Sequence, residues 1–446
     1  AGGGGETDYG IAAGGDRVKA TELLSTLPSG WRTVPLKAAC YYTVSNVDKH
    51  SIEDEIPVRL CNYTDVYKND RVSPELELMV ATATEDEIEK FHLEVGDVVI
   101  TKDSESWDDI GIPAYVEATA EDFICGYHLA FMRPNSGLLE GRFLFRCVQS
   151  RPVALQLELE ATGVTRYGLP KGAIGNALIP LPSLETQRLI ADYLDRETAR
   201  IDALVAEKEK MLALLEEKRA ALISRAVTRG LDPNAPLKPS GLDWLGDIPK
   251  HWTVERAKNL FSVRDQRSES GLEELLTVSH ITGVTPRSEK DVYMFQADDK
   301  AGYKLCYPGD LVINTLWGWM GAMGISSLEG IVSPDYHVYT SKGLLLPEFV
   351  ELLCRSKPFV AEVNRWSKGV WSSRLRLYPE NFFEMRLPVP PHDDQRNIIA
   401  AVEESQHKTK ELAGVMQQSI SLAKERRAAL ITAAVTGQIS VEEMAA

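Results

Sequence analysis

The longest regular pattern of apolar and polar positions runs through residues 183–230. Ala, Leu, Glu, Lys and Arg dominate this stretch, and neither Pro nor Gly occurs between Ser183 and Arg229, so the composition favours a helix. Ser183 suits the N-cap position, and Gly230 followed by Pro233 suits a stop. At about 1.5 Å per residue, such a helix measures on the order of 70 Å, which exceeds the width of a typical domain.

Apolar side chains recur along this stretch in steps of three, four and seven residues, as one seam of a coiled coil requires. The predicted seam consists of Ile190, Leu194, Ile201, Leu204, Met211, Leu215 and Leu222. A second long helix is predicted over residues 391–437, with a thinner stripe of Ile398, Val402, Leu412, Met416, Ala423 and Leu430. Because a lone helix cannot bury such a stripe, we expect the two helices to pair as an antiparallel coiled coil. A generic helical hairpin would carry the same periodicity.

Two globular regions, the first head (residues 27–182) and the second head (residues 250–390), carry short apolar runs separated by Gly, Pro and Asn. These runs favour β-strands and include Asp97–Thr101, Phe143–Val148, Asp310–Asn314 and Val332–Tyr339. Residues 231–249 form a linker whose Pro and Gly residues interrupt any regular element, residues 1–26 are expected to be flexible, and residues 438–446 form a C-terminal tail. The predicted fold is α+β, with two β-rich α/β heads in tandem, each followed by a long helix.

The two halves of the chain repeat each other. Residues 180–188 recur as residues 388–396, and residues 218–228 recur as residues 426–436, both at an offset of 208 residues. Within the heads the offset drifts, as the pairing of Gly96 with Gly309 illustrates. Insertions and deletions therefore accumulated in the heads, while the helices kept their length.

Composition is that of a soluble globular protein, with 44% hydrophobic and 26% charged residues. No run approaches the roughly 18 consecutive apolar residues of a membrane span, so no membrane partner is expected. The six cysteines are far apart, which favours reduced thiols in a cytoplasmic protein. The net charge of −16 opposes non-specific binding of nucleic acid by the whole surface but leaves room for a local basic patch. The first head holds about 14 basic and 24 acidic residues, whereas residues 248–390 hold about 17 of each.

Candidate DNA contacts are Arg and Lys side chains, which bind phosphates and guanine, and polar or aromatic side chains in Gly-rich loops. In the second head the candidates are Trp317, Trp319, Arg365, Lys368, Arg374 and Arg376. In the first head they are Arg133, Arg146, Thr165, Arg166 and Lys171. The alternatives are core positions for the tryptophans and solvated surface charges for the arginines. The acidic segments at residues 85–89 and 103–109 are expected to face away from DNA and to suit a protein partner.

Motifs for catalysis are missing from the sequence. It contains no Asn/Asp-Pro-Pro-aromatic motif of an amino-methyltransferase, no Walker motif for ATP, and no histidine spacing typical of a metal site. We therefore expect no catalytic residue and no metal in this chain. A partner polypeptide would supply any chemistry.

One family shares the combined pattern. The pattern begins with Gly, Thr or Ser, and Arg, and continues with Pro-Leu/Val-Pro and with Gln-Arg at the start of a long helix. It ends with Arg-Ala-Ala-Leu-Ile and with Ala-Val-Thr before a Gly, and it spans residues 163–230 and again 369–437. Residues 241–252 are similar to the usual opening of such a repeat, of which residues 27–31 keep the last portion. Over residues 27–440 the chain resembles the specificity subunit of type I restriction-modification enzymes. Each motif alone is weak, and together they are specific.

The resemblance implies two target-recognition domains that each read one half of a split double-stranded DNA site, with paired helices fixing the unread spacer. It also implies assembly with two DNA adenine methyltransferase subunits and with ATP-dependent restriction subunits that contain a motor and a nuclease. S-adenosylmethionine, ATP and magnesium would then bind the partner subunits. Because heads of this family vary greatly, no base-contacting residue is carried over by motif.

Two alternatives remain open at the level of the sequence. The chain could serve a related system in which modification and cleavage are fused in one partner polypeptide. It could also be a coiled-coil scaffold whose heads bind proteins, a reading that the charge of −16 favours.

Overall fold

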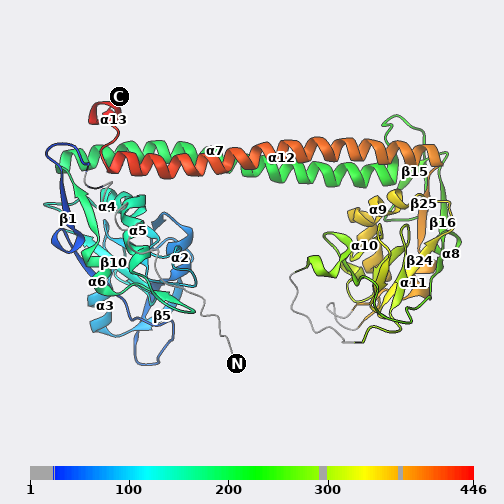
Figure 1. Ribbon diagram of the computed structural model, residues 1–446, viewed down its shortest axis with the longest axis horizontal. Helices are drawn as coiled ribbons and strands as arrows, with labels where there is room; N and C mark the ends of the chain where they lie inside the picture. Colours follow the sequence, from blue (N-terminus) through cyan, green and yellow to red (C-terminus); the bar gives the residue numbers. More distant parts are fainter. Residues whose placement is uncertain (1–23, 25, 291–298, 370–374, 446) are drawn as a thin grey trace, which may run out of the picture. The chain divides into compact units, whose positions relative to one another are not determined.

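The computed structural model describes residues 24, 26–290, 299–369 and 375–445. The chain divides into two compact units (Figure 1). The first unit comprises Ala1–Glu207 with Gln418–Ala446, and the second comprises Lys208–Gln417. Each unit therefore contains one head together with a segment of both long helices, although these segments are far apart in the sequence.

The first head is built on three sheets and a two-stranded ladder. The five-stranded sheet has the order β2 (Cys40–Val44), β10 (Leu129–Pro134), β6 (Val98–Thr101), β8 (Pro113–Val116), β4 (Arg71–Val72). Two three-stranded sheets are formed by β5 (Met79–Ala83), β3 (Ile56–Cys61) and β9 (Phe123–Cys125), and by β11 (Thr162–Gly163), β12 (Tyr167–Gly168) and β7 (Asp103–Ser104). The ladder pairs β1 (Arg32–Pro35) with β13 (Leu178–Leu181).

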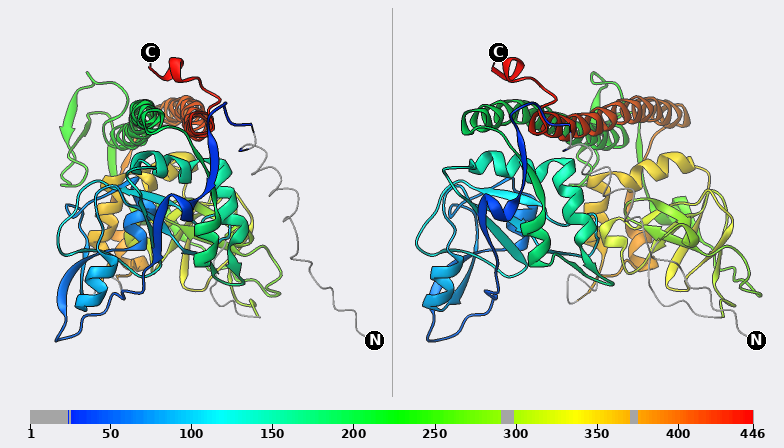
Figure 2. Two further views of the ribbon diagram at one scale, coloured as in Figure 1. Left: turned by 90° about the vertical axis from the view of Figure 1, so that its left-hand side faces the viewer. Right: turned by 60° about the vertical axis from the view of Figure 1, so that its left-hand side comes forward.

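Helices cover the first head on the side of the long helices, where α4 and α5 lie beneath α7 (Figures 1 and 2). The helices of this unit, apart from the long ones, are α2 (Tyr63–Lys68), α3 (Glu85–Phe91), α4 (Gly141–Gln149), α5 (Arg151–Glu160), α6 (Lys171–Asn176) and α13 (Val441–Ala445), with the 3-10 turn η1 (Leu36–Ala38).

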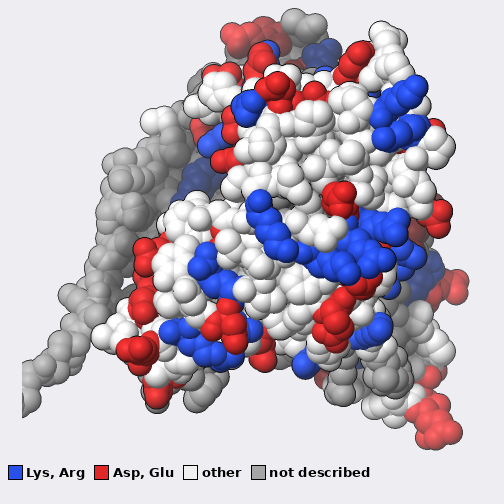
Figure 3. Space-filling view, turned by 90° about the vertical axis from the view of Figure 1, so that its right-hand side faces the viewer, with Lys and Arg blue, Asp and Glu red and all other residues white. Residues whose placement is uncertain are grey.

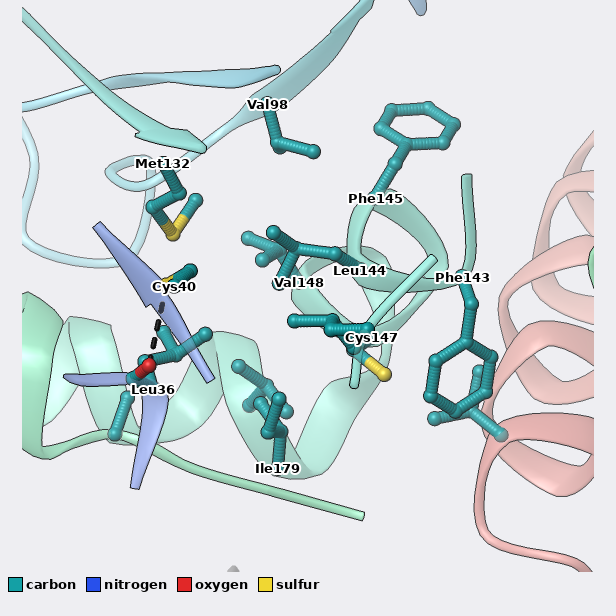
Figure 4. Packing of buried hydrophobic residues seen from close by; sticks show 14 of the residues in the cluster. Leu36, Cys40, Val98, Met132, Phe143, Leu144, Phe145, Cys147, Val148 and Ile179 are labelled. Carbon is teal, nitrogen blue, oxygen red and sulfur yellow. Dashed lines mark hydrogen bonds between the residues drawn. The ribbon is translucent and has the colours of Figure 1, made fainter. Parts of the chain in front are cut away.

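The segment Phe143–Val148, predicted as a strand, is the centre of helix α4. All six of its residues are buried, because α4 packs in one hydrophobic cluster with the sheet and with both long helices. Figure 4 shows Leu144 and Val148 turned toward Val98 and Met132 of the sheet. An apolar run of only about four to eight residues fits a buried strand or a segment of a buried helix, and its composition alone does not distinguish the two.

The second head has a four-stranded sheet and three two-stranded ladders. The sheet order is β17 (Phe261–Val263), β24 (Tyr336–Ser341), β21 (Leu311–Asn314), β22 (Met323–Ile325). The ladders pair β16 (Thr253–Arg256) with β25 (Arg386–Val389), β18 (Leu276–Ser279) with β19 (Gly283–Pro286), and β20 (Lys304–Cys306) with β23 (Gly330–Val332). Its helices are α8 (Ala257–Leu260), α9 (Pro347–Arg355), α10 (Lys357–Trp366) and α11 (Pro379–Glu384), with 3-10 turns η2 (Arg287–Glu289) and η3 (Gly318–Met320).

Two further predictions need correction in this unit. The single strand predicted over Val332–Tyr339 is two strands, β23 and β24, that are separated by a turn at residues 333–335. The predicted linker contains a short ladder between β14 (Leu237–Pro239) and β15 (Asp247–Pro249). Proline at the ladder ends is compatible with pairing because an edge position needs no backbone N–H donor.

The long helices are α7 (Leu184–Arg229) and α12 (His392–Val435). In the first unit Ile190 and Leu194 of α7 share a hydrophobic cluster with Ile431 of α12. In the second unit Ile223 of α7 shares another with Ile398 of α12. Fully burying a side chain of this size contributes about 1.5 to 3 kcal/mol, so these clusters hold the helices to the heads.

The predicted seam is wrong at three positions in the middle of the helices. Leu204, Met211 and Leu412 are 50%, 47% and 44% exposed. Val205 is buried instead, and Leu212 and Ala413 are half-buried. The seam thus passes one residue later, through positions such as Lys208 and Arg219 whose stems are half-buried although their ends are charged. Ile190, Leu194, Ile398, Val402 and Met416 are buried as predicted, and Ile201, Leu215, Leu222 and Leu430 are half-buried.

Within the described ranges, no helix is both long enough and apolar enough to span a membrane.

Candidate nucleic-acid interface

Thr165 and Arg166 of the first head lie in the turn of a β-hairpin. The hairpin pairs β11 with β12, and β12 in turn pairs with β7, which begins at Asp103. Both side chains are exposed. Gly163 opens the turn, and a Cβ atom there would lie 1.9 Å from the carbonyl oxygen of Arg166. Only glycine fits, which gives a physical reason for the first residue of the Gly-x-Thr-Arg motif.

Arg166 lies in a small polar cluster with His128 and Asp103. Its Nη2 atom is 3.3 Å from both ring nitrogens of His128, and His128 Nδ1 is 2.7 Å from Asp103 Oδ2. Lys102 Nζ approaches the same carboxylate at 3.1 Å. Burial alone would raise the pKa of Asp103, but the hydrogen bonds from His128 and Lys102 outweigh it and hold the pKa below its usual value. The carboxylate therefore stays ionised beside Arg166.

His128 adopts a positive φ of 70°, which no other non-glycine residue in the described parts of the chain does. Backbone strain of this kind is kept where the surroundings fix it, often at binding sites. Two stacked tyrosines, Tyr63 and Tyr67, lie nearby with ring centroids 5.5 Å apart, and the Tyr67 hydroxyl donates to Asp109 at 3.0 Å. Sequence reasoning missed these aromatics because they are on α2, about 100 residues before the hairpin.

The segment 103–109 was expected to face away from DNA, and the structure places its first residue, Asp103, close to the candidate Arg166. Strand β7 pairs with β12, so Asp103 is beside the hairpin that carries Arg166. Pairing between strands distant in sequence brought the acidic segment to the basic candidate. A carboxylate in such a cluster can accept hydrogen bonds from base amino groups.

Two arginines of the first head serve internal ion pairs instead of an open surface. Arg133 donates from Nη2 to Asp97 at 2.7 Å and from Nη1 to Glu94 at 2.7 Å. Arg146 is only 4% exposed and bonds to Asp195 of α7 at 2.8 Å. Both are therefore removed from the DNA-contacting candidates. Lys171 is exposed at the start of α6, where its Nζ lies 5.6 Å from the centre of the Tyr42 ring.

Trp317 and Trp319 of the second head follow strand β21. Trp317 directly precedes the 3-10 turn η3, and Trp319 lies within it. Their rings stack with centroids 6.2 Å apart, and Trp317 is 49% exposed. Trp319 is half-buried and donates from Nε1 to the carbonyl of Leu316 at 3.1 Å. The alternative of a core position does not hold for Trp317. Exposed aromatic rings of this kind suit stacking and apolar contacts to bases.

Lys368 and Arg376 are joined by two backbone hydrogen bonds of 2.9 Å. Both side chains are exposed, and Arg374 lies outside the described residues. This pair adjoins the tryptophan turn, because a Cβ atom at Gly318 would lie 3.7 Å from Leu377 Cβ. The structure thus brings the two predicted groups of the second head together.

Arg365 forms a bidentate pair with the buried carboxylate of Glu362, at 2.7 Å for each bond. Its charge is largely neutralised within helix α10, so it is a weaker candidate than Lys368 or Arg376.

A cavity of about 360 Å³ lies beside Trp317 in the second head. Its walls carry both polar and cationic groups, including Arg287, Lys300, Tyr303 and Asn314, with Asp335 on the same wall. Asn314 donates from Nδ2 to the Tyr336 hydroxyl at 3.0 Å. The combination of an exposed indole and hydrogen-bonding groups can recognise planar, hydrogen-bonding ligands such as bases.

A second basic group is present on the separate β16–β25 ladder of the second head, where Arg256 and Arg386 face each other across the two strands. Like charges in such a position destabilise a ladder, and Glu384 offsets this at 3.3 Å from Arg256. Figure 3 shows Lys and Arg side chains gathered on this side, with acidic side chains among them. The even balance of charge in this head thus includes a locally basic face.

Metal-ligand clusters and thiols are two kinds of reactive group that can be checked in the described part of the chain. No set of three or more His, Cys, Asp or Glu side chains could hold a metal ion there. All six cysteines are buried and free, and burial raises the pKa of each thiol, to about 12 for Cys40 and to about 11 for Cys306. Such thiols are poor nucleophiles.

Residues 56–213 match the family model for the type I restriction modification DNA specificity domain. The chain is 24% identical over 176 residues to the putative type I restriction enzyme MjaX specificity subunit of Methanocaldococcus jannaschii, covering 39% of this chain and 40% of that subunit. It is 22% identical over 272 residues to the type I restriction enzyme EcoBI specificity subunit of Escherichia coli, covering 56% and 55%. The matched stretches thus span about half, or less, of these relatives.

Solved structures show the same fold over most of the chain. A chain from a type I R-M system superposes with a TM-score of 0.66 and 17% identity, covering 93% of this chain and 100% of that one. The HsdS subunit from Thermoanaerobacter tengcongensis superposes with a TM-score of 0.51 and 18% identity, covering 93% and 98%. The family match and the curated relatives thus confirm the resemblance to type I restriction-modification specificity subunits, and the solved structures show the same fold.

Proposed function

We propose that this chain is the DNA sequence-specificity subunit of a type I restriction-modification complex. The two heads are its target-recognition domains, and each reads one half of a bipartite DNA site. Helices α7 and α12 pair as an antiparallel coiled coil that keeps the heads apart and sets the length of the unread spacer. The chain selects the site and performs no catalysis.

The observation that carries the proposal is a junction between head and helix that occurs twice. Gln187 and Gln395 are fully buried in the first turns of α7 and α12. Gln187 accepts from the amide of Glu140 at 2.9 Å, and Gln395 accepts from the amide of Leu346 at 2.7 Å. Each also donates at 3.0 Å to a carbonyl of its head. Two DNA-reading domains that are held a fixed distance apart require such a repeated module, in which specific hydrogen bonds join each head to its helix.

The ends of the long helices repeat in the same way. Gly230 ends α7 with a φ of 73°, and its Cβ position lies 3.4 Å from the ring of Trp252. Gly437 follows α12 with the same φ, and its Cβ position lies 3.3 Å from the ring of Trp31. Each long helix thus ends against the opening of a head, so this helix-to-head contact also occurs twice.

Three observations support antiparallel pairing. In the first unit the start of α7 clusters with the end of α12, and Arg427 Nε lies 2.9 Å from Asp202. In the second unit the end of α7 clusters with the start of α12. Residue numbers therefore rise along one helix as they fall along the other, which is the sense of an antiparallel coiled coil.

We further propose that two DNA adenine methyltransferase subunits and ATP-dependent restriction subunits assemble on this chain. S-adenosylmethionine, ATP and magnesium would bind those subunits. The exposed Leu204, Met211 and Leu412 leave apolar surface on the helices for such partners. We expect the assembled complex to be cytoplasmic, because its DNA substrate is there.

Sequencing of methylated bases after co-expression with the partner methyltransferase tests the proposal. We expect methylated adenine in one bipartite motif of two short half-sites. A genome that stays unmethylated although the methyltransferase is bound and folded would contradict it. A single fused methyltransferase-nuclease as the bound partner would instead support the related system.

The charge of −16 favours the remaining alternative, a scaffold whose heads bind proteins. Binding of the methyltransferase without any sequence-dependent binding of DNA by the complex would support that alternative.

A further inference from the structure

The first head is joined to the long helices by a network of ion pairs, in addition to the junction at Gln187. Arg146 of α4 is at its centre and is only 4% exposed. Its Nη2 atom donates to Asp195 Oδ1 at 2.8 Å and to Thr198 Oγ1 at 3.0 Å, both on α7. Its Nη1 atom donates to Gln149 at 2.9 Å. The position of α4 relative to α7 is thus fixed by directional bonds from one guanidinium.

Asp195 receives two more arginines of the first head. Arg71, on β4, lies 3.2 Å from Asp195 Oδ2, and Arg142 lies 3.3 Å from the same atom. Arg142 also reaches Asp192 at 2.7 Å. Three side chains from two elements of the head therefore converge on one carboxylate of the helix.

The second long helix takes part through Arg427. This residue contacts Asp70 of the first head and lies 2.9 Å from Asp202 of α7. The first head is consequently bonded to segments of both long helices within its own unit.

The second head uses different contacts at the matching place. Helices α4 and α9 begin 206 residues apart, at Gly141 and Pro347, so Leu352 occupies the position of Arg146. At the offset of 208 residues within the long helices, Glu403 occupies that of Asp195. Glu403 lines a cavity of about 660 Å³ together with Arg219, the counterpart of Arg427, and residues of α9. Arg219 pairs with Glu216 on its own helix at 2.9 Å, and Arg355 of α9 pairs with Glu351 at 2.7 Å.

An ion pair and an apolar cluster hold a domain in different ways. Apolar contact is non-directional, so a head packed only by apolar side chains can tilt with little loss. Charge-assisted bonds depend on distance and angle, and a buried charge that loses its partner is strongly disfavoured. Buried ion pairs often contribute little net stability, so a directional, orienting role explains Arg146 better than a stabilising one.

We propose that Arg146 is a positioning residue, which through Asp195 sets the orientation of the first head on the long helices and thereby the spacer length that the subunit accepts. This inference rests on the proposed function. It assigns spacer selectivity to a junction residue as well as to helix length, and it separates that role from the reading of bases by Arg166 or Trp317.

The test is methylome sequencing of the complete complex with Arg146→Met, and with the double variant Arg146→Met/Asp195→Leu. The double variant replaces the pair by apolar groups and leaves no uncompensated charge at these two positions, so it keeps the test valid if the single variant folds poorly. The control is Arg200→Ala, which removes only an exposed pair with Glu197 on the same helix. We expect unchanged half-site bases and, in the double variant, methylation of sites whose spacer differs by one base pair, at least tenfold above wild type.

Methylation restricted to the wild-type spacer in the double variant, at any overall level, would overturn the positioning role. Changed half-site bases would overturn it as well, because Arg146 would then act on reading. A wild-type complex without a bipartite motif would instead contradict the proposed function itself.

Discussion

The side-chain oxygen of Gln187 accepts a hydrogen bond from the backbone amide of Glu140 at 2.9 Å, 47 residues earlier in the chain. The same relationship joins Gln395 to Leu346 at 2.7 Å in the second unit. Neither glutamine is exposed, and each has its amide group bonded to the head and to the proline-containing strand end before its helix. The hydrogen bonds of the buried glutamine therefore give a structural reason for the first position of the Gln-Arg motif at the start of both helices.

We predict that Gln187→Ala and Gln395→Ala each destabilise the unit that contains the residue. Each substitution leaves one backbone amide N–H and two backbone carbonyls without their partner, at a cost of about 1 to 3 kcal/mol for each group that is left unsatisfied. The midpoint of chemical denaturation should fall in both variants. Gln417→Ala, at an exposed position of α12, is the control and should change stability by less than about 0.5 kcal/mol. Equal effects at all three positions would contradict the role of the buried pair.

Replacing Arg166 should weaken DNA binding by the assembled complex. Arg166→Ala removes the exposed guanidinium at the hairpin turn, with an expected loss of at least ~1 kcal/mol if it contacts a base. Titration of the complex with its DNA site at fixed salt measures this. Arg200→Ala provides a control of equal charge change on the helix. Identical affinities for the two variants would move the reading surface away from the hairpin.

The pH dependence of stability should reveal the bond between Asp103 and His128. The pKa of Asp103 is lowered in the folded chain, so its contribution is fully present above the unfolded pKa, about 4, and is lost as pH falls through the folded value. Asp103→Asn should therefore be less stable than wild type at neutral pH, by roughly 1 kcal/mol or more, because charge-assisted hydrogen bonds are lost. The difference should shrink below about pH 4. A stability difference that grows on acidification would contradict a lowered pKa of Asp103 in the folded chain.

Helix length should determine spacer length. Inserting one heptad into α7 and one at the facing position in α12 keeps the seam in phase and adds about 10 Å to each helix. At about 3.4 Å per base pair, the spacer should lengthen by about three base pairs, with both half-sites intact. Altered half-sites with an unchanged spacer would contradict the proposal that helix length sets spacer length.

Some features of this molecule could be predicted from the sequence because they depend on local composition. The limits of α7 follow from the absence of Pro and Gly before Gly230, and the repeat identified the module. The seam at Val205 could not be found by apolar periodicity, since Lys208 and Arg219 occupy half-buried positions along it. The strand predicted at Phe143–Val148 is a helix, because a short apolar run fits either element and only its packing against the sheet and the long helices decides.

The candidate site was predicted in part. Exposed arginine and tryptophan in glycine-rich turns, as at Arg166 and Trp317, can be recognised from local sequence. Arg133 and Arg146 could not be excluded in advance, because their partners Asp97 and Asp195 are 36 and 49 residues away. Contacts between residues that are distant in the sequence decide which arginines form internal ion pairs. They also decide the placement of Asp103 beside Arg166.

The central claim is that the two heads read different halves of one DNA site. It is tested most directly by methylome sequencing of complexes with Arg166→Ala in the first head and Trp317→Ala in the second. We expect each variant to relax or change one half-site, the two variants to affect opposite halves, and the spacer to stay as in wild type. Variants that alter the same half-site, or that leave a motif with no division into halves, would contradict it.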